Sequence, residues 1–212
     1  MAVSTFYPSL DGRVYKTSGN DTWSNLVTGT GTAAEDSNST GNAPLTDTGT
    51  TSGRFDFISR GIFLFDTSSI PDDDEITSAT LSFYVGSKST GITVSVNVVA
   101  SNPASDSSLA AGDYQTVGST KFSTAIAVSA ISTSAYVDFN LNASGISAIN
   151  KTGLSKFASR LEEDIDNSAP TWASNVLAGI NVNFSESTGT STDPKLVVTH
   201  APPATRRIFM IT

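Results

Sequence analysis

The chain of 212 residues contains no cysteine and a single histidine, His200. The absence of cysteine excludes disulfide bonds, thiolate catalysis and cysteine-ligated zinc sites. Charged residues are also scarce, at 15% of the chain against roughly 25% in an average soluble domain. Serine and threonine are abundant instead, so hydroxyl groups replace charges in keeping the surface hydrated.

Basic side chains are in the minority: 12 lysines and arginines stand against 20 aspartates and glutamates, giving a formal net charge of −8. A nucleic-acid-binding protein needs a basic surface to neutralise phosphates, so nucleic acid is not an expected partner. No run approaches the roughly 18 apolar residues of a membrane span, so membrane insertion is not expected. The first residues, MAVSTFYPSLDGRVY, lack the basic and apolar regions of a signal peptide, which predicts synthesis in a cytoplasm without export by that route.

The sequence does contain a repeated alternation of apolar and polar residues with a period of two, which is typical of strands with one buried face. This alternation runs through residues 79–85, 93–100, 136–142 and 176–184. Residues 61–65, GIFLF, are apolar throughout and predict a central strand buried on both faces. KLVVTH at 195–200 predicts a further strand that is nearly two-sided.

Helical patterns are weak by comparison. Residues 142–150, NASGISAIN, offer Asn142 or Ser144 as an N-cap and two isoleucines three residues apart, which supports one short helix. Turn-forming clusters recur between the strands. We therefore predict an all-β fold, a jelly-roll-like antiparallel β-sandwich with at most one short helix, which forms a single domain over residues 1–200.

Two segments fall outside the strand pattern. Residues 24–53 predict a long polar loop, either a flexible surface excursion or a loop ordered by contacts in an assembly. Residues 201–212 form a C-terminal tail whose apolar run would be prone to aggregation if exposed. We expect this tail to dock on the chain's own sheet or on another subunit. The residues predicted to mediate assembly are Arg206, Arg207, Ile208, Phe209, Met210 and Ile211.

Four consecutive acids, Asp72, Asp73, Asp74 and Glu75, follow Pro71 between two predicted strands. Metal binding needs oxygens that converge on one point, whereas contiguous carboxylates in an extended chain splay apart. The acids therefore predict a solvated turn. A calcium ion is compatible with this turn but nothing in the sequence indicates one, so no metal site and no cofactor are predicted.

The segment around this turn resembles a known family. Residues 60–71 contain Arg60 followed by FDTSSIP, and residues 76–81 contain ITSATL. In this order they resemble the DNRLRE-type β-sandwich modules, which are related to disaggregatase repeats and to some carbohydrate-binding modules. DGRVYKTSGNDTW at 11–23 and DPKLVVTH at 193–200 are similar to the opening and closing strands of that family. The resemblance implies a jelly-roll-like sandwich that binds carbohydrate or serves as a surface module, without catalysis.

The chain departs from that family in having no recognisable signal peptide, no attached enzyme and the RRIFMIT tail. These departures favour a non-enzymatic bacteriophage virion protein: a capsid decoration, a head fibre or a tail-associated module. Such a protein is made in the host cytoplasm and located on the virion. Its expected partners are other virion proteins, copies of itself in a homo-oligomer, and host surface glycans. The alternative is a free carbohydrate-binding module, and a polysaccharide-acting enzyme is a less favoured third possibility.

Candidate site residues follow from these functions. Trp23, Trp172 and Tyr114 lie in polar contexts and predict a platform on which sugar rings stack. Their alternative role is to cover the open end of the sandwich. An acyl-transfer triad would have to use His200 as its base, but no G-x-S-x-G motif is present. His200 is therefore interpreted as an ordinary strand-end histidine, and no catalytic residue is predicted.

Overall fold

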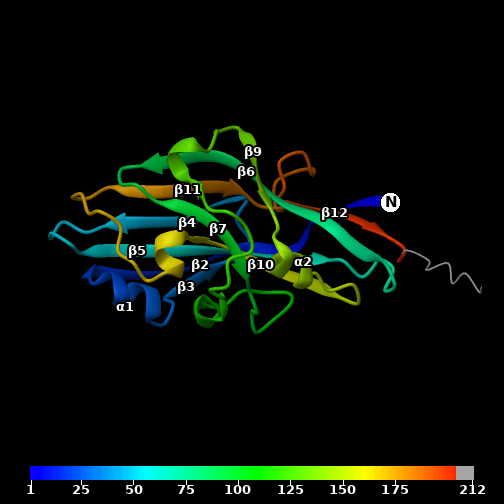
Figure 1. Cartoon of the computed structure of the whole chain (residues 1–212). Helices are drawn as coiled ribbons and strands as arrows, with labels where there is room; N and C mark the ends of the chain where they lie inside the picture. The colour runs from blue at the N-terminus through cyan, green and yellow to red at the C-terminus, as the bar shows by residue number, and fades with distance from the viewer. Residues whose placement is uncertain (204–212) are drawn as a thin grey trace, which may run out of the picture.

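The computed structural model describes residues 1–203, and within them the fold is all-β, as predicted. The strands, visible in Figure 1, are β1 (Ala2–Phe6), β2 (Pro8–Asp21), β3 (Ala33–Glu35), β4 (Thr40–Thr48), β5 (Phe55–Asp66), β6 (Glu75–Thr90), β7 (Ser95–Ala100), β8 (Ile126–Ala127), β9 (Ala135–Asn140), β10 (Leu154–Leu161), β11 (Leu177–Asn183) and β12 (Lys195–Ala201). The helices are α1 (Trp23–Thr28), α2 (Ala143–Ser147), α3 (Glu162–Ile165) and the 3₁₀ helices η1 (Ala111–Thr116) and η2 (Val128–Ala130).

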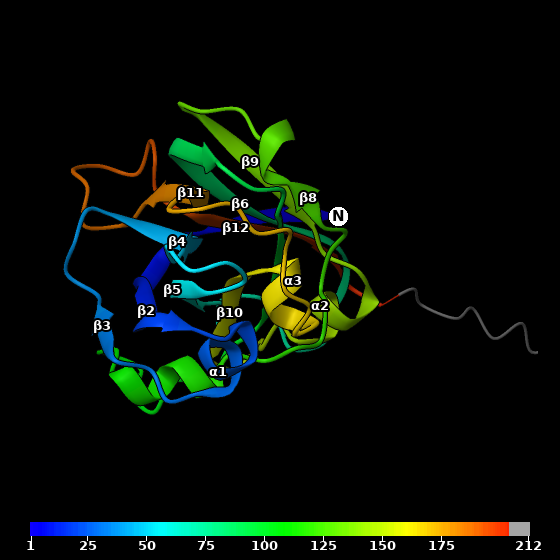
Figure 2. The same cartoon turned by 90° about the vertical axis from the view of Figure 1, so that its left-hand side faces the viewer.

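All strands belong to one antiparallel sheet with the main order β1-β12-β6-β11-β4-β5-β10-β7-β8, to which β2, β3 and β9 attach from the side. The sheet is strongly curled, as the end-on view in Figure 2 shows. Phe63 on β5 and Phe83 on β6 illustrate the curl, because their ring centroids are 4.5 Å apart although two strands separate them in the sheet order. The predicted sandwich of two separate sheets is therefore not confirmed.

Strand β5 forms the centre of the core, which confirms the prediction made for GIFLF. Its residues from Ile58 to Phe65 are all buried, so both faces of the strand are covered. It pairs with β2, β4 and β10. Each fully buried Leu, Ile or Phe side chain contributes roughly 1.5–3 kcal/mol of transfer free energy, so this strand supplies a large share of the stability.

The prediction of a long polar loop over residues 24–53 is wrong. This segment contains most of α1, together with β3 and the central strand β4, which lies between β11 and β5. Thr46 and Thr48 of β4 are fully buried. Their hydroxyl groups donate to the carbonyl oxygens of Phe57 (2.9 Å) and Val176 (3.1 Å). A threonine hydroxyl that forms such a hydrogen bond can be buried, so this central strand lacks the continuous apolar side chains by which a buried strand is usually recognised.

The predicted short helix at residues 142–150 is present, but the structure contains more helices than the one predicted. Asn142 caps α2, and its side-chain oxygen accepts the N–H of Gly145 at 3.1 Å. Residues 1–203 also contain α1, α3 and two 3₁₀ helices. Each is six residues or fewer, too short for a helical period to be visible in the sequence.

Strand β12 has one buried face, formed by Leu196, Val198 and His200, whereas the sequence predicted that both faces would be nearly buried.

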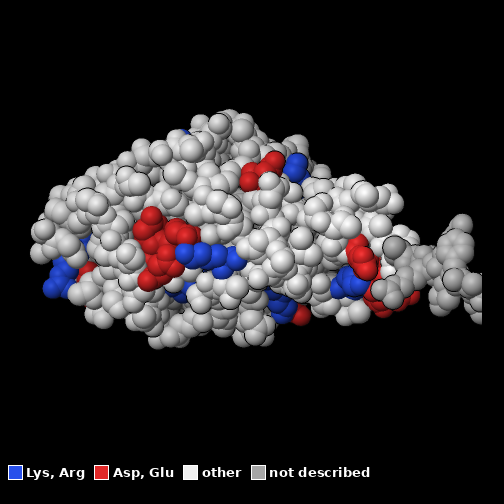
Figure 3. Space-filling model, viewed as in Figure 1, with Lys and Arg blue, Asp and Glu red and all other residues white. Residues whose placement is uncertain are grey.

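Figure 3 shows that uncharged residues cover most of one face of the molecule, in keeping with the low content of charged residues. Within the described part of the chain, no helix is both long and apolar enough to cross a membrane.

Candidate functional site

The predicted sugar platform is not formed, because two of its three aromatic rings are inside the protein. Trp23 is 4% exposed and packs edge-on against Phe55, and its indole N–H donates to the carbonyl oxygen of Glu163 at 3.3 Å. Tyr114 is fully buried, and its hydroxyl donates to the carbonyl oxygen of Leu26 at 2.9 Å. Buried backbone carbonyls satisfy both polar groups, so these rings can sit in the core although their sequence neighbours are polar.

Trp172 is partly buried and packs against the hydrophobic core. Its indole N–H donates to the carbonyl oxygen of Arg54 at 2.9 Å. This position agrees with the alternative of a tryptophan that covers the core. A stacking platform made of Trp23, Tyr114 and Trp172 is therefore ruled out by the burial of the first two rings.

The predicted assembly residues, Arg206 to Ile211, lie outside the described residues. The structure does place the two ends of the described chain together. Strand β1 pairs with β12 from Ala2 opposite His200 to Phe6 opposite Leu196, at one end of the sheet order. Figure 1 shows the N-terminus beside β12 at one end of the molecule. We call the pair β1 and β12 the terminal edge.

Strand β1 of the terminal edge carries no charged side chain, and β1 and the residues on either side of it expose apolar side chains. Met1, Val3 and Tyr7 are 92%, 67% and 40% exposed, which makes them three of the most exposed large hydrophobic residues. Residues 1–10 contain no charged side chain. Edge strands carry unpaired N–H and C=O groups, and proteins that stay monomeric usually protect such edges with lysine, proline, bulges or a covering segment. The terminal edge is therefore suited to pairing with another strand.

A chain of three side chains fastens this edge to the rest of the sheet. Ser4 Oγ lies 3.0 Å from His200 Nε2, and His200 Nδ1 lies 2.6 Å from Asp74 Oδ2. The register explains the first contact, because Ser4 faces Val198 and is therefore a diagonal neighbour of His200 on the same face of the sheet. Asp74 directly precedes β6, whose Ile76 pairs with His200. Three segments far apart in the sequence thus meet in one hydrogen-bonded group.

This group corrects two predictions. Asp72 and Asp73 are exposed, but Asp74 is 8% exposed and bonded to His200, so it does not belong to a solvated turn. His200 is 5% exposed and uses both ring nitrogens, which distinguishes it from an ordinary strand-end histidine. No short motif links positions 4, 74 and 200, so only the strand register could have revealed the group.

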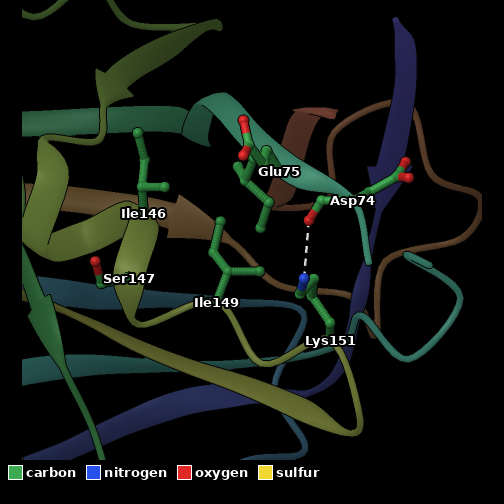
Figure 4. Close-up of a pocket in the computed structure, with 7 residues that line it drawn as sticks. Asp74, Glu75, Ile146, Ser147, Ile149 and Lys151 are labelled. Carbon is green, nitrogen blue, oxygen red and sulfur yellow. Dashed lines mark hydrogen bonds between the residues drawn. The ribbon is translucent and has the colours of Figure 1, made fainter. Parts of the chain in front are cut away.

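The three residues have the connectivity of a serine–histidine–aspartate triad. Ser4 lies within an edge strand, however, and not on a strained strand-to-helix turn. Asp74 lines a surface pocket (Figure 4) in which Lys151 donates to its backbone carbonyl at 2.8 Å. The residues that line this pocket are Asp74, Glu75, Ile76, Ile146, Ser147, Ile149 and Lys151. Ser4 and His200 do not line it, so the pocket does not bring a substrate to the serine.

A second surface feature lies on the face formed by β2, β4, β5 and β11. A groove of about 340 Å³ there is lined by Arg13, Thr17, Asn42, Leu45, Asp47, Asp56, Phe57 and Leu177; we call it the sheet groove. The ring centroids of Tyr15 on β2 and Phe57 on β5 are 5.3 Å apart. The guanidinium carbon of Arg13 lies 5.1 Å from the centroid of the Tyr15 ring. Burial and the nearby Asp56 carboxylate raise the pKa of Asp47. The groove thus combines an aromatic ring with carboxylate and amide groups.

Comparisons with known proteins add no assignment. No protein-family model matches the chain, and no curated protein matches it. The resemblance to DNRLRE-type modules therefore stays a prediction from the sequence. Among residues 1–203, no cluster of three or more histidine, aspartate or glutamate side chains is arranged to hold a metal ion.

Proposed function

We propose that the protein is a non-enzymatic structural protein of a bacteriophage particle, which assembles with copies of itself and with other virion proteins through its terminal edge. The observation that carries this proposal is strand β1, which lies at the end of the sheet, contains no charged residue and exposes Val3, with the exposed Met1 directly before it.

The edge has the chemistry of a strand-addition site. A further strand that pairs with β1 would satisfy its outward N–H and C=O groups and cover Val3. The occupant we propose is a second copy of this chain. Strand β12, which ends at Ala201, belongs to this same edge, and the predicted assembly residues 206–211 follow it in the sequence.

The Ser4–His200–Asp74 group supports this role by making the edge rigid. It ties β1 to β12 and to the start of β6 through side chains, in addition to the backbone ladder. A strand that is already held in its bound conformation loses less entropy when it pairs with a partner. The group thus has a structural explanation that needs no substrate.

The test of this proposal is the mass of the purified protein in solution, measured for the full chain and for a version that ends at Ala201. We expect the full chain to form a defined oligomer and the shortened chain to be a folded monomer. A monomer in both cases, up to the highest soluble concentration, would overturn assembly through the terminal edge.

The sheet groove favours a second candidate function, carbohydrate binding. Aromatic rings stack on apolar sugar faces while carboxylates and amides fix the orientation of the ring, and the groove presents both. Binding on a glycan array that Asp47→Asn weakens by about tenfold or more, a loss of about 1.4 kcal/mol, would support this function. The matched control is Asp72→Asn, which changes an exposed aspartate outside the groove. Equal glycan binding by both variants would exclude the sheet groove as the binding site.

A further inference from the structure

A cluster of three buried charges lies away from both surfaces described above. Asp164 of α3 is fully buried between Arg60 of β5 and Arg160 of β10. Arg60 donates from Nε and Nη2 to the two carboxylate oxygens at 2.8 and 2.7 Å. Arg160 donates from the same two nitrogens to the same two oxygens, both at 2.8 Å. One carboxylate therefore holds two guanidinium groups in bidentate geometry.

The charges in this cluster do not balance. Two guanidinium groups against one carboxylate leave one positive charge. Burial on its own raises the pKa of Asp164, but Arg60 and Arg160 pull it below its usual value, so the carboxylate is charged at neutral pH. Burial lowers the pKa of Arg60, yet the attraction of Asp164 outweighs this and raises it. The excess positive charge is thus a permanent feature of the folded protein, in a chain whose net charge is −8.

Among residues 1–203, the hydrogen bonds of the two arginines leave one donor on each. Besides Asp164 Oδ1 and Oδ2, Arg60 donates from Nη2 to the carbonyl oxygen of Val27 and from Nη1 to that of Tyr114. Arg160 donates from Nη2 to the carbonyl oxygen of Asp164 and from Nη1 to that of Gly118. A guanidinium has five N–H groups, of which each arginine uses four. The remaining N–H of each residue is on Nη1.

Both arginines line one surface pocket of about 320 Å³, although their side chains are only 3% and 6% exposed. We call it the arginine pocket. Its other lining residues are Val27, Thr28, Gln115, Val117, Gly118 and Ser119. None of them is acidic, and Gln115 and Ser119 are exposed at its rim. The pocket has room for several water-sized groups, which is enough for a small anion.

A purely structural role accounts for only part of this arrangement. The cluster ties α1, η1 and α3 to the sheet, because each arginine gives two donors to backbone carbonyl oxygens and two to the Asp164 carboxylate. This role explains four donors on each arginine. Backbone carbonyls carry no net charge, so they satisfy the second guanidinium without neutralising it. Buried charges that are not paired are costly, and they are usually retained with a partner. The Tyr114 ring, whose centroid lies 3.7 Å from Arg60 Cζ, offsets part of this cost but carries no net charge. An anion that enters from the pocket would balance the remaining positive charge.

We propose that the arginine pocket binds a small oxyanion group, namely a carboxylate, sulfate or phosphate, which accepts hydrogen bonds from the free Nη1 donors of Arg60 and Arg160. Guanidinium groups are well suited to this chemistry, because their planar donors match the oxygens of such anions. Ser119 and Gln115 at the rim can donate to the outer oxygens. This binding site is independent of the terminal edge and of the sheet groove.

The experiment is an NMR or calorimetric titration of the full chain with inorganic sulfate, inorganic phosphate and glucuronate, at constant ionic strength. Glucose serves as the neutral counterpart of glucuronate, and chloride as the monovalent salt control. Saturable binding of at least one oxyanion is expected, with a Kd below about 20 mM. Tighter binding of glucuronate than of sulfate or phosphate would identify the group as part of an acidic saccharide, and the reverse order as a free inorganic anion.

Substitution of Arg60 or Arg160 risks unfolding the protein, so the decisive variants are at the rim. Ser119→Asp and Gln115→Glu each place a carboxylate at the pocket while leaving the cluster intact, and each should weaken oxyanion binding about tenfold or more through repulsion. The matched control Ser132→Asp adds the same charge at an exposed position outside the pocket and should bind as the unmodified chain does. No saturable binding of any oxyanion, or equal loss in Ser119→Asp and Ser132→Asp, would overturn the proposal.

Discussion

Ser4 Oγ lies 3.0 Å from Nε2 of His200, so a side-chain hydrogen bond joins β1 to β12. Asp74, 2.6 Å from Nδ1 of His200, accepts the Nδ1 proton when the ring is neutral. Nε2 then accepts the proton of the Ser4 hydroxyl, which fixes the tautomer of the ring. The same contact that resembles a catalytic relay also determines how firmly the terminal edge is held.

Replacing Ser4 with alanine should lower the free energy of unfolding. The substitution leaves Nε2 of a buried histidine without a partner, which costs about 1–3 kcal/mol. Denaturant unfolding measures this loss, and faster hydrogen exchange in residues 2–6 would locate it in β1. Thr5→Ala is the matched control, because Thr5 is exposed on the same strand, and it should change stability by less than about 0.5 kcal/mol. An equal effect of the two substitutions would show that the Ser4 bond contributes nothing.

The structural role of this group also predicts that Ser4 is not a nucleophile. A fluorophosphonate probe, which labels activated serines, should leave the protein unmodified as judged by its intact mass. Short-chain ester substrates should likewise show no turnover above that of Ser4→Ala. Covalent labelling at Ser4, or turnover that the alanine variant loses, would contradict the non-enzymatic proposal and assign Ser4, His200 and Asp74 to a catalytic triad.

Assembly through the terminal edge should be sensitive to charge at position 3. Val3 is 67% exposed on the edge strand, so Val3→Lys introduces the side chain that natural edges use against pairing, without disturbing the core. We expect this variant to sediment as a folded monomer under conditions in which the unmodified chain is oligomeric. Leu177→Lys is the matched control, since Leu177 is a 43% exposed hydrophobic residue of β11 away from this edge. Dissociation by Leu177→Lys alone would place the contact on the sheet groove instead.

The sequence predicted correctly those features that depend on residues close together in the chain. Residues 61–65 are apolar on both faces of a strand, and this pattern predicted the buried centre of the sheet correctly. Asn142 was one of the two predicted caps for the same reason, because a cap depends on residues three apart, and the structure shows Asn142 and not Ser144 in this role. Strand β4 was missed because Thr46 and Thr48 bury satisfied hydroxyls, which a count of apolar residues takes for surface.

The sites depend on non-local geometry, and the sequence was correspondingly less informative about them. Trp23 and Tyr114 have polar neighbours, but carbonyl oxygens from distant segments satisfy their polar atoms and allow them into the core. The contact of Ser4 with His200 requires the register of β1 against β12, which hydrophobic periodicity does not specify between strands so far apart in the chain.

Asp11 of β2 has a fully buried carboxylate, which accepts hydrogen bonds from the N–H and the hydroxyl of Ser185. Burial, reinforced by the nearby charges of Glu186 and Asp193, raises the pKa of Asp11 from 3.8 to about 7 despite the bonds from Ser185. Because the folded state favours the protonated form, the contribution of Asp11 to stability is fully present below about pH 4 and is lost as the pH rises to about 7. With 1.36 kcal/mol per pKa unit, the loss amounts to ~4 kcal/mol.

Asp11→Asn keeps an oxygen that can accept from Ser185 and removes the titration. Urea unfolding between pH 4 and pH 8 should therefore show a flatter pH dependence for the variant, which becomes more stable than the unmodified chain at the upper end. Glu186→Gln is the control, because Glu186 is the less buried neighbour and its own pKa is also raised. It should reduce the pH dependence only slightly, since burial is the main cause of the Asp11 shift. Parallel curves for the unmodified chain and Asp11→Asn would mean that Asp11 is already ionised in the folded protein throughout this range.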